Sequence, residues 1–307
     1  MVATTEQAAK ALSNGELVIF PTETVYGLGA DARNGEAVAE IFAAKGRPQF
    51  NPLIAHIRDL EMGEEIAEFN DLARRLAAAF WPGPMSLVLP LCGDAGISEL
   101  VTAGLSTIAL RVPNHPTAQE LLSAFNGPIA APSANISGKL SPTRAGDLSE
   151  DVRARAAMVL EGEVSSVGLE STILMPEEDR IFLLRSGAIT SEMVRELTDI
   201  TPEPLSSEDK PKSPGQLLKH YAPNTPLVLD CEEWPPEAVH IGFGDREGDF
   251  NLSQTADLTE AAANLFAMLH AADRLAIEAT KSKITVAPVP AYGLGVAIND
   301  RLKRASS

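Results

Sequence analysis

Short apolar runs alternate with amphipathic segments along the first 200 residues of the chain. From Ala37 to Phe42, apolar residues recur with the spacing of one helix face, which predicts a helix over 35–45. Further helices are expected to end at Gly15, to span 71–80 and 118–125, and to begin at Ser191. Compact apolar runs bounded by turn residues predict strands. These strands are 16–20, 52–57, 85–91, 106–112, 128–134, 158–163, 171–175 and 180–185. The pattern predicts an α/β (α+β) fold with a mixed sheet and flanking helices.

The composition changes after Ile200. Residues 201–225 are rich in proline, serine and charge, which is typical of a linker. A second α/β pattern then begins, with apolar segments at 226–230, 238–244, 261–272 and 274–279 and a final helix ending in 298–305. We therefore expect a first domain over 1–200, a linker over 201–225 and a small α/β domain over 226–307.

The charge and the cysteines restrict the classes of function. With a net charge of −17, bulk attraction to nucleic acid or to an anionic membrane is unfavourable, so a polyphosphate ligand would need a local basic pocket. Cys92 and Cys231 form neither a disulfide framework nor a CxxC metal knuckle. No apolar run is long enough to span a bilayer, and the first residues do not resemble a signal peptide, so we expect a cytoplasmic protein.

Familiar catalytic signatures are missing, including the Walker A loop, HExxH and GxSxG. The glycines Gly27 and Gly29, with Ala32, imitate a dinucleotide fingerprint. Arg47 and Pro48 stand where that fingerprint requires an acidic residue, so we do not expect a nicotinamide site.

Two segments near the start combine glycine with polar side chains. In 21–32, threonines, a glutamate and a tyrosine precede Gly27 and Gly29, which indicates either a tight turn or a close approach to a ligand. In 44–56, Lys45 and Arg47 follow a predicted helix. They would either complement the helix dipole or bind phosphate, and the nearby Asn51 and His56 leave the same choice between a structural role and ligand binding.

Three later segments carry further candidates. Thr107 and Arg111 share one face of a predicted strand, and a buried arginine there requires a carboxylate from the chain or from a ligand. Short polar side chains crowd behind the next strand, where they would cap a turn or contact a nucleotide. They are Ser133, Asn135, Ser137 and Ser141, followed later by Ser171 and Arg185.

Taken in order, these segments resemble one family. PTETVYGLG, KGRPQFNPL, WPGP, RVPNHP, APSAN and ESTI are similar to the signature segments of the YrdC-like threonylcarbamoyl-AMP synthases. The segment SPGQLLKHYAPNTP resembles the linker of the longer, two-domain form of that family. The resemblance implies a YrdC-like twisted mixed sheet with flanking helices and a smaller, Rossmann-like C-terminal α/β domain.

The resemblance also implies site residues. Lys45 and Arg47 are the family's catalytic pair. The threonine site is implied at Thr24, His56, Arg111, Ala131 and Ser171. The ATP site is implied at Arg47, Asn51, Thr107, Ser133, Asn135, Ser141, Arg185 and Tyr221. Arg111 would form a fork with the threonine carboxylate. Magnesium is expected on phosphate oxygens and water, with no protein ligands.

The reaction implied is the joining of L-threonine, bicarbonate and ATP into threonylcarbamoyl-AMP with release of pyrophosphate, which requires alignment and positive charge more than a nucleophile. A separate transferase would carry the product to tRNA, and no stable binding of tRNA or membrane by this chain is expected. The linker over 201–225, with a hinge at Pro214–Gly215, is predicted to close over the site and exclude water. Two alternatives remain: a carbamoyl-adenylate enzyme with another acceptor, and a non-catalytic RNA-binding or ribosome-assembly module.

Overall fold

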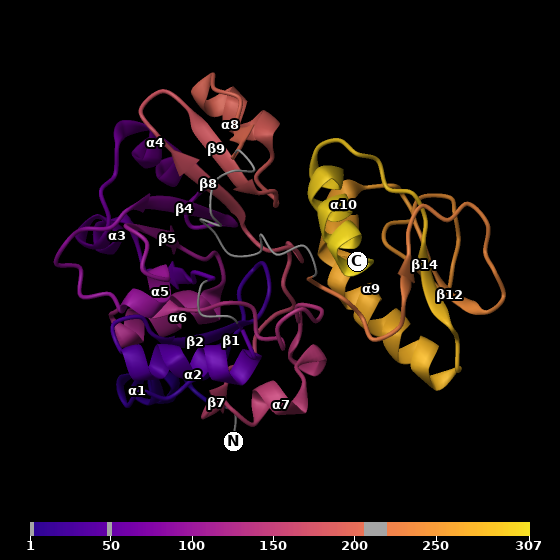
Figure 1. Ribbon diagram of the computed structural model, residues 1–307, viewed down its shortest axis with the longest axis horizontal. Helices are drawn as coiled ribbons and strands as arrows, with labels where there is room; N and C mark the ends of the chain where they lie inside the picture. The colour runs from indigo at the N-terminus through magenta and orange to yellow at the C-terminus, as the bar shows by residue number, and fades with distance from the viewer. Residues whose placement is uncertain (1–2, 48–50, 206–219) are drawn as a thin grey trace.

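The computed structural model describes residues 3–47, 51–205 and 220–307. Within these ranges the chain forms two units, each built on its own β-sheet (Figure 1). The predicted hinge at Pro214–Gly215 lies outside the described residues. No helix in the described ranges is long and apolar enough to cross a membrane.

The sheet of the first unit has ten strands among the described residues, in the order β10-β9-β8-β4-β5-β3-β6-β2-β1-β7. They are β1 (Val18–Phe20), β2 (Gly27–Asp31), β3 (Ile54–His56), β4 (Met85–Pro90), β5 (Thr107–Arg111), β6 (Ile129–Ala130), β7 (Met158–Val159), β8 (Thr172–Pro176), β9 (Ile181–Arg185) and β10 (Glu203–Pro204). Parallel and antiparallel pairs both occur: β3 runs parallel to β5, whereas β6 runs antiparallel to β3. The sheet is therefore mixed, as predicted.

Helices cover both faces of this sheet (Figure 1). They are α1 (Thr5–Ser13), α2 (Gly35–Lys45), α3 (Leu60–Ile66), α4 (Asp71–Phe80), α5 (Glu99–Thr102), α6 (Pro116–Phe125), α7 (Glu150–Arg153) and α8 (Ser191–Thr198), with a 3-10 turn at Ala145–Asp147. Helices α2 and α4 have the predicted bounds because an asparagine begins each of them. Asn34 and Asn70 accept hydrogen bonds from backbone N–H groups of the first turn, which would otherwise lack partners.

The second unit has a four-stranded sheet in the described part of the chain, ordered β11-β14-β12-β13, with every pair parallel. Its elements are β11 (Leu227–Val228), β12 (Ala238–Gly242), β13 (Phe250–Asn251), α9 (Leu258–Glu278), β14 (Lys283–Val286) and α10 (Leu294–Ala305). Helices α9 and α10 lie between this sheet and the first unit (Figure 1).

Several elements differ from the predictions. Helices α3, α5 and α7 were not predicted, and strand β10 lies inside the predicted linker over 201–225. Residues 274–279, predicted as a separate segment, are the last turns of α9, and the strand that follows is β14. Strand β2 was not predicted, because its segment indicated either a tight turn or a close approach to a ligand. Its glycines allow close packing, because a Cβ atom on Gly29 would lie 2.8 Å from side-chain atoms of Phe20 and Ile129.

The two units meet over an extensive interface. Val25, Leu140 and Leu169 of the first unit belong to the same buried cluster as the core of the second. Gly168 has a left-handed backbone (φ +69°), and a Cβ atom there would lie 2.4 Å from the carbonyl oxygen of Ala263 in α9. The chain backbones therefore pack directly against each other at this point.

Candidate functional site

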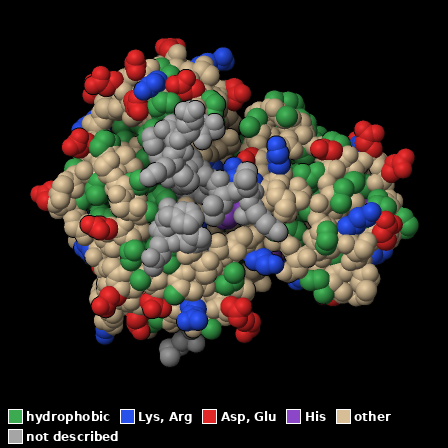
Figure 2. Space-filling view, in the orientation of Figure 1, with side chains coloured by type: hydrophobic (Ala, Val, Ile, Leu, Met, Phe, Trp, Pro, Cys, Tyr) green, Lys and Arg blue, Asp and Glu red, His purple; other side chains and the backbone are tan. Residues whose placement is uncertain are grey.

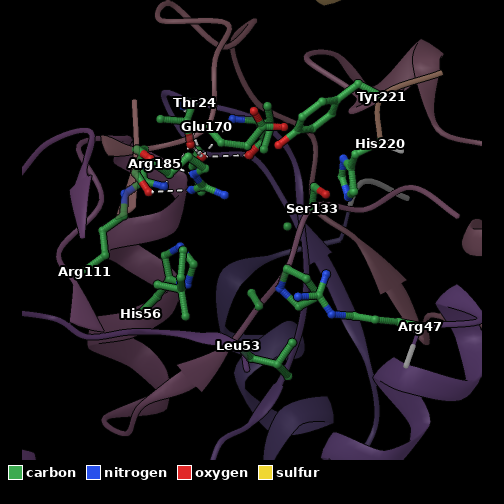
Figure 3. Close-up of a pocket in the computed structure, with 17 residues that line it drawn as sticks. Thr24, Arg47, Leu53, His56, Arg111, Ser133, Glu170, Arg185, His220 and Tyr221 are labelled. Carbon is green, nitrogen blue, oxygen red and sulfur yellow. Dashed lines mark hydrogen bonds between the residues drawn. The ribbon is translucent and has the colours of Figure 1, made fainter. Parts of the chain in front are cut away.

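A cavity lies over the centre of the first sheet and is bounded on one side by His220 and Tyr221, just before the second unit. It sits on the face that carries Ile54 and His56 of β3 and Arg111 of β5, because alternate residues of a strand share a face. In Figure 3, His56 and Arg111 approach from one side and Arg47 from the other. In Figure 2, basic side chains and a histidine are visible in the groove between the units, while acidic side chains are scattered over the rims.

Arg47 and Arg185 bring two guanidinium groups to the cavity. Arg47 donates from Nη2 to the carbonyl oxygen of Pro52 at 3.2 Å, but its buried Nε has no hydrogen-bond partner within the described chain. Burial lowers the pKa of Arg47 to about 10, so the group still carries its charge at neutral pH. Arg185 donates from Nε to the backbone oxygen of Ser171 at 3.0 Å and from Nη2 to its hydroxyl at 3.0 Å.

Arg111 occupies the opposite wall and already has partners within the chain. Its Nη1 donates to Thr24 Oγ1 at 2.8 Å, and its Nε donates to the carbonyl oxygen of Gly83 at 3.2 Å. Its Nη2 lies 2.6 Å from a carboxylate oxygen of Glu23, and both side chains are buried. The sequence left open whether Arg111 pairs with a carboxylate of the chain or of a ligand, and the structure supplies Glu23.

His56 is buried between Arg111 and the aromatic ring of Phe20, whose centroid lies 5.9 Å away. Burial, aided by the charge of Arg111, lowers its pKa to about 3. Its Nδ1 has no hydrogen-bond partner within the described chain. A neutral imidazole with a free nitrogen at a cavity wall can accept or donate one hydrogen bond to a ligand.

Lys45 is buried behind the cavity and does not line it. Its ammonium group donates to the carbonyl oxygens of Ser133 and Asn135. Asn135 in turn accepts from the Ser133 hydroxyl and donates to Ile136 O at 2.9 Å and Lys139 O at 2.7 Å. Burial and the charge of Arg47 hold the pKa of Lys45 well below its usual value. Lys45 and Asn135 thus fix the loop that presents Ser133 to the cavity.

Glu170 lines the cavity and links it to the second unit. One of its oxygens accepts from Ser141 Oγ at 2.6 Å and the other from Arg301 Nε at 2.9 Å. Burial alone would raise the pKa of Glu170, but Arg301, Arg185 and the Ser141 hydroxyl outweigh it and lower the pKa. Glu170 is therefore an ionised carboxylate at neutral pH.

His220 and Tyr221 line the side of the cavity nearest the second unit, and both side chains are buried. The Tyr221 ring lies 5.4 Å from that of Phe266 and 5.6 Å from the guanidinium carbon of Arg301. Its hydroxyl end points toward the cavity (Figure 3). Burial, with Glu170, raises the pKa of Tyr221 to about 12, and burial lowers the pKa of His220 to about 3.

The structure brings most of the predicted residues together. Those that line the cavity are Thr24, Arg47, His56, Arg111, Ala131, Ser133, Ser171, Arg185 and Tyr221. The predicted residues outside the lining are Lys45, Asn51, Thr107, Asn135 and Ser141. Thr107 begins β5 on the same face as Arg111, and Ser141 contacts the cavity through Glu170.

Sequence reasoning missed three charged residues of this region: Glu23, Glu170 and Arg301. Two of them lay inside the quoted motifs PTETVYGLG and ESTI, where acidic residues were a visible signal. Arg301 carried no such signal, because it lies 131 positions from Glu170 on a different unit.

The acidic groups near the cavity do not form a set of metal ligands. Glu23 and Glu170 are each engaged by an arginine. The described ranges contain no group of three or more His, Cys, Asp or Glu side chains arranged to hold a metal ion.

Comparisons with known proteins agree with this geometry. Residues 10–187 match the profile of a family described as "Telomere recombination", which groups Sua5, YciO and YrdC. Residues 189–307 match the profile of the "Threonylcarbamoyl-AMP synthase, C-terminal domain". The threonylcarbamoyl-AMP synthase of Bacillus subtilis is 40% identical, over 98% of this chain and 92% of its own length. That of Pyrococcus abyssi is 39% identical, over 97% and 93%. The crystal structure of P. abyssi Sua5 complexed with L-threonine matches with a TM-score of 0.88 and 36% identity, covering 98% of this chain and 94% of that one.

Proposed function

The chain belongs to the family of threonylcarbamoyl-AMP synthases, and we propose that its cavity joins L-threonine, bicarbonate and ATP into threonylcarbamoyl-AMP with release of pyrophosphate. The observation that supports this most is the pairing of a cationic wall with buried polar atoms that lack partners. Arg47 Nε and His56 Nδ1 are such atoms in the described chain. Buried polar atoms are normally hydrogen-bonded, so a polar, anionic ligand would complete them.

The chemistry proceeds in two steps. The threonine amine attacks bicarbonate and water leaves, which gives a carbamate. A carbamate oxygen then attacks the α-phosphorus of ATP, and pyrophosphate leaves with the electron pair of the broken P–O bond. Neither step needs a covalent intermediate with the protein. Both need the reactants to be aligned and the phosphate charge to be stabilised.

We assign the phosphates to the wall of Arg47 and Arg185, because planar guanidinium groups bind phosphate oxygens through paired hydrogen bonds. Ser133 lies on this side of the cavity, on the loop that Lys45 and Asn135 hold. Thr107, Asn51 and Ser141 remain proposed ATP contacts, although the cavity lining does not include them. Tyr221 would meet the nucleotide from the second unit's side.

Threonine is assigned to the opposite wall, near Thr24, His56, Arg111 and Ser171, with the small side chain of Ala131 leaving room. Arg111 would bind the substrate carboxylate while it keeps Glu23 as its partner. Because the imidazole of His56 has a pKa of about 3, it would act as a neutral hydrogen-bonding group and not as a cation. Threonine is the ligand named for the P. abyssi structure.

Magnesium would enter as part of the ATP substrate, bound to phosphate oxygens and water, because the carboxylates around the cavity are already paired with arginines. In the cytoplasm, the product would pass to a transferase that modifies tRNA. With a net charge of −17, stable binding of bare tRNA by this chain would be weak. We divide the chain into a catalytic domain over 1–200, a linker over 201–225, much of which lies outside the described residues, and a small C-terminal α/β domain over 226–307.

One assay tests the proposed function directly. The protein is incubated with ATP, magnesium, bicarbonate and threonine, and pyrophosphate release is measured together with the mass of the adenylate. Pyrophosphate should appear only when threonine and bicarbonate are both present. Equal release without threonine would contradict the assignment, and so would release that depends on RNA in place of threonine.

A further inference from the structure

Arg301 of α10 crosses the interface and ends beside the cavity of the first unit. Its side chain is 0% exposed. Its Nε donates to Glu170 at 2.9 Å, its Nη1 pairs with Asp300 at 2.8 Å, and its Nη2 donates to the backbone oxygen of Ser186 at 2.8 Å. All three guanidinium nitrogens are therefore used, and two of the three partners belong to the other unit.

Glu170 is the one carboxylate among the described residues that line the cavity. A negative charge at this place opposes the binding of the phosphate chain of ATP, because like charges repel strongly where water is excluded. The charge of Arg185 also acts on this carboxylate, but its hydrogen bonds go to Ser171. The guanidinium of Arg301 is the group in direct contact with the carboxylate.

We propose that Arg301 is a positioning residue for the ATP site: it neutralises and fixes the Glu170 carboxylate, so that the second unit completes the site of the first. This inference rests on the proposed function, because it requires a polyanionic substrate in the cavity. It assigns to α10 a role in substrate affinity that a spacer or docking domain would not have.

The fixed carboxylate also orders a second group. Glu170 accepts a hydrogen bond from the Ser141 hydroxyl, which is fully buried, so the position of Ser141 depends on that of Glu170. Two hydrogen bonds, from Arg301 to Glu170 and from Ser141 to Glu170, therefore connect α10 to the loop that follows Ser133 and Asn135. Loss of Arg301 would release this loop as well as the charge.

A change of pH distinguishes this role from simple docking. Without Arg301, burial would dominate and raise the pKa of Glu170, so that lowering the pH would protonate the carboxylate and remove its repulsion of phosphate. The charged and titratable groups that act on Glu170 or are acted on by it are Arg301, Arg185, Lys45, His220 and Tyr221, with the Ser141 hydroxyl in contact. At each pH, the KM of the variant is divided by that of the wild type, which removes the effect that the ionisation of ATP itself has on KM.

The test compares Arg301→Gln with the double variant Arg301→Gln/Glu170→Gln. Threonine-dependent pyrophosphate release is measured at about pH 8 and about pH 6, after thermal unfolding has shown that each protein is folded. The single variant should raise the KM for ATP at least about tenfold at the higher pH and less at the lower pH, with a smaller change in kcat. The double variant, which removes both charges, should recover most of the lost affinity.

Arg274→Gln is the matched control. Arg274 also forms an arginine–carboxylate pair across the interface, with Asp147 at 3.2 Å, but it is 53% exposed and does not line the cavity. Its loss should leave the KM for ATP within about twofold of the wild-type value, as expected for an exposed ion pair.

If Arg301→Gln does not fold, Arg301→Lys is measured instead. It keeps a positive charge beside Glu170 but loses the planar fork, so its KM for ATP should rise by less than about tenfold. Four results would overturn the inference. The KM for ATP of Arg301→Gln could be unchanged, or it could rise equally at both pH values. The double variant could bind ATP no better than the single one, or the Lys variant could bind ATP at least about tenfold more weakly than the wild type. If the wild-type protein itself releases no pyrophosphate with threonine, the proposed function fails instead.

Discussion

The two units contribute polar groups of different kinds to their common boundary. In the first unit, Arg47 and His56 have buried nitrogen atoms without partners in the described chain. In the second, every nitrogen of Arg301 is engaged, and the carboxylate of Asp273 accepts three hydrogen bonds from Asn224 and Thr225. The difference indicates that the first unit is built to receive a ligand and the second to hold the site in shape.

The same contrast separates two neighbours in sequence. Lys45 and Arg47 have the same charge and lie two residues apart. Lys45 donates its hydrogen bonds to carbonyl groups of the chain, whereas Arg47 faces the cavity. Substitutions at these positions should therefore affect different properties.

The largest effect is expected from Lys45→Met, and it should fall on stability. Removing the ammonium group leaves the buried carbonyl groups of Ser133 and Asn135 without their donor, which should lower the free energy of unfolding by about 2–5 kcal/mol. Urea unfolding measures this change. Lys10→Met is the control, because Lys10 also lies in the last turn of a helix but is exposed. If both variants unfolded alike, Lys45 would be a helix-end charge only.

Arg47→Ala should have the next largest effect, and it should fall on substrate use. The loss of charge-assisted contacts to phosphate is worth about 1.5–3 kcal/mol, or roughly a 10- to 150-fold drop in kcat/KM for ATP. Little stability should be lost, since the Arg47 side chain makes one hydrogen bond within the described ranges, from Nη2 to the carbonyl oxygen of Pro52. Arg33→Ala, at an exposed arginine paired with Asp31, gives the baseline. An Arg47→Ala protein that melts early but keeps full activity would reverse the comparison.

His56 should make stability depend on pH. Because its pKa is about 3 in the folded protein and near 6.5 when unfolded, the unfolded chain binds a proton between these values that the folded chain does not. Its contribution is present above about pH 6.5 and is lost as the pH falls, by up to about 1.4 kcal/mol per pH unit.

Unfolding free energies of the wild-type protein and of His56→Gln, measured from neutral to mildly acidic pH, should therefore converge. Parallel curves would show that His56 titrates normally in the folded protein and that burial does not disfavour its protonated form.

Tyr221 stands where the two units meet, and Tyr221→Phe should have the smallest effect. The substitution keeps the ring contacts with Phe266 and Arg301 and removes only the hydroxyl group. We expect stability to be unchanged and the KM for ATP to rise no more than about fivefold, the value of one neutral hydrogen bond. Tyr221→Leu, which also loses the ring, should destabilise the interface. Full activity in both variants would leave Tyr221 with a docking role alone.

Local signals in the sequence predicted much of the fold. The helices over 35–45 and 71–80 were predicted to the residue, because an asparagine cap and a regular apolar face define each of them. Strand β2 escaped prediction because glycine is a poor strand former. Its glycines are explained by the side chains of Phe20, Ile129 and Ala131, which lie elsewhere in the sequence.

In the site, too, local signals predicted some features, while others depend on residues far apart in the sequence. Arg111 was predicted to need a carboxylate from its position in an apolar strand, but the choice of Glu23 depends on how β1 and β2 place the loop between them. The sequence around Lys45 left a choice between complementing the helix dipole and binding phosphate. The carbonyl groups that Lys45 contacts lie 88 and 90 positions away in the sequence. Arg301 had no local signal at all, because its role arises only when α10 meets Glu170.

The opposite signs of the exterior and the cavity have a kinetic consequence. A protein with a net charge of −17 repels a polyanion at long range, although the cavity attracts it at short range through Arg47 and Arg185. Dissolved salt screens the long-range repulsion more than the buried contacts. Capture of the nucleotide should therefore become faster as ionic strength rises from low values, the reverse of the behaviour of enzymes whose surface charge draws their substrate in.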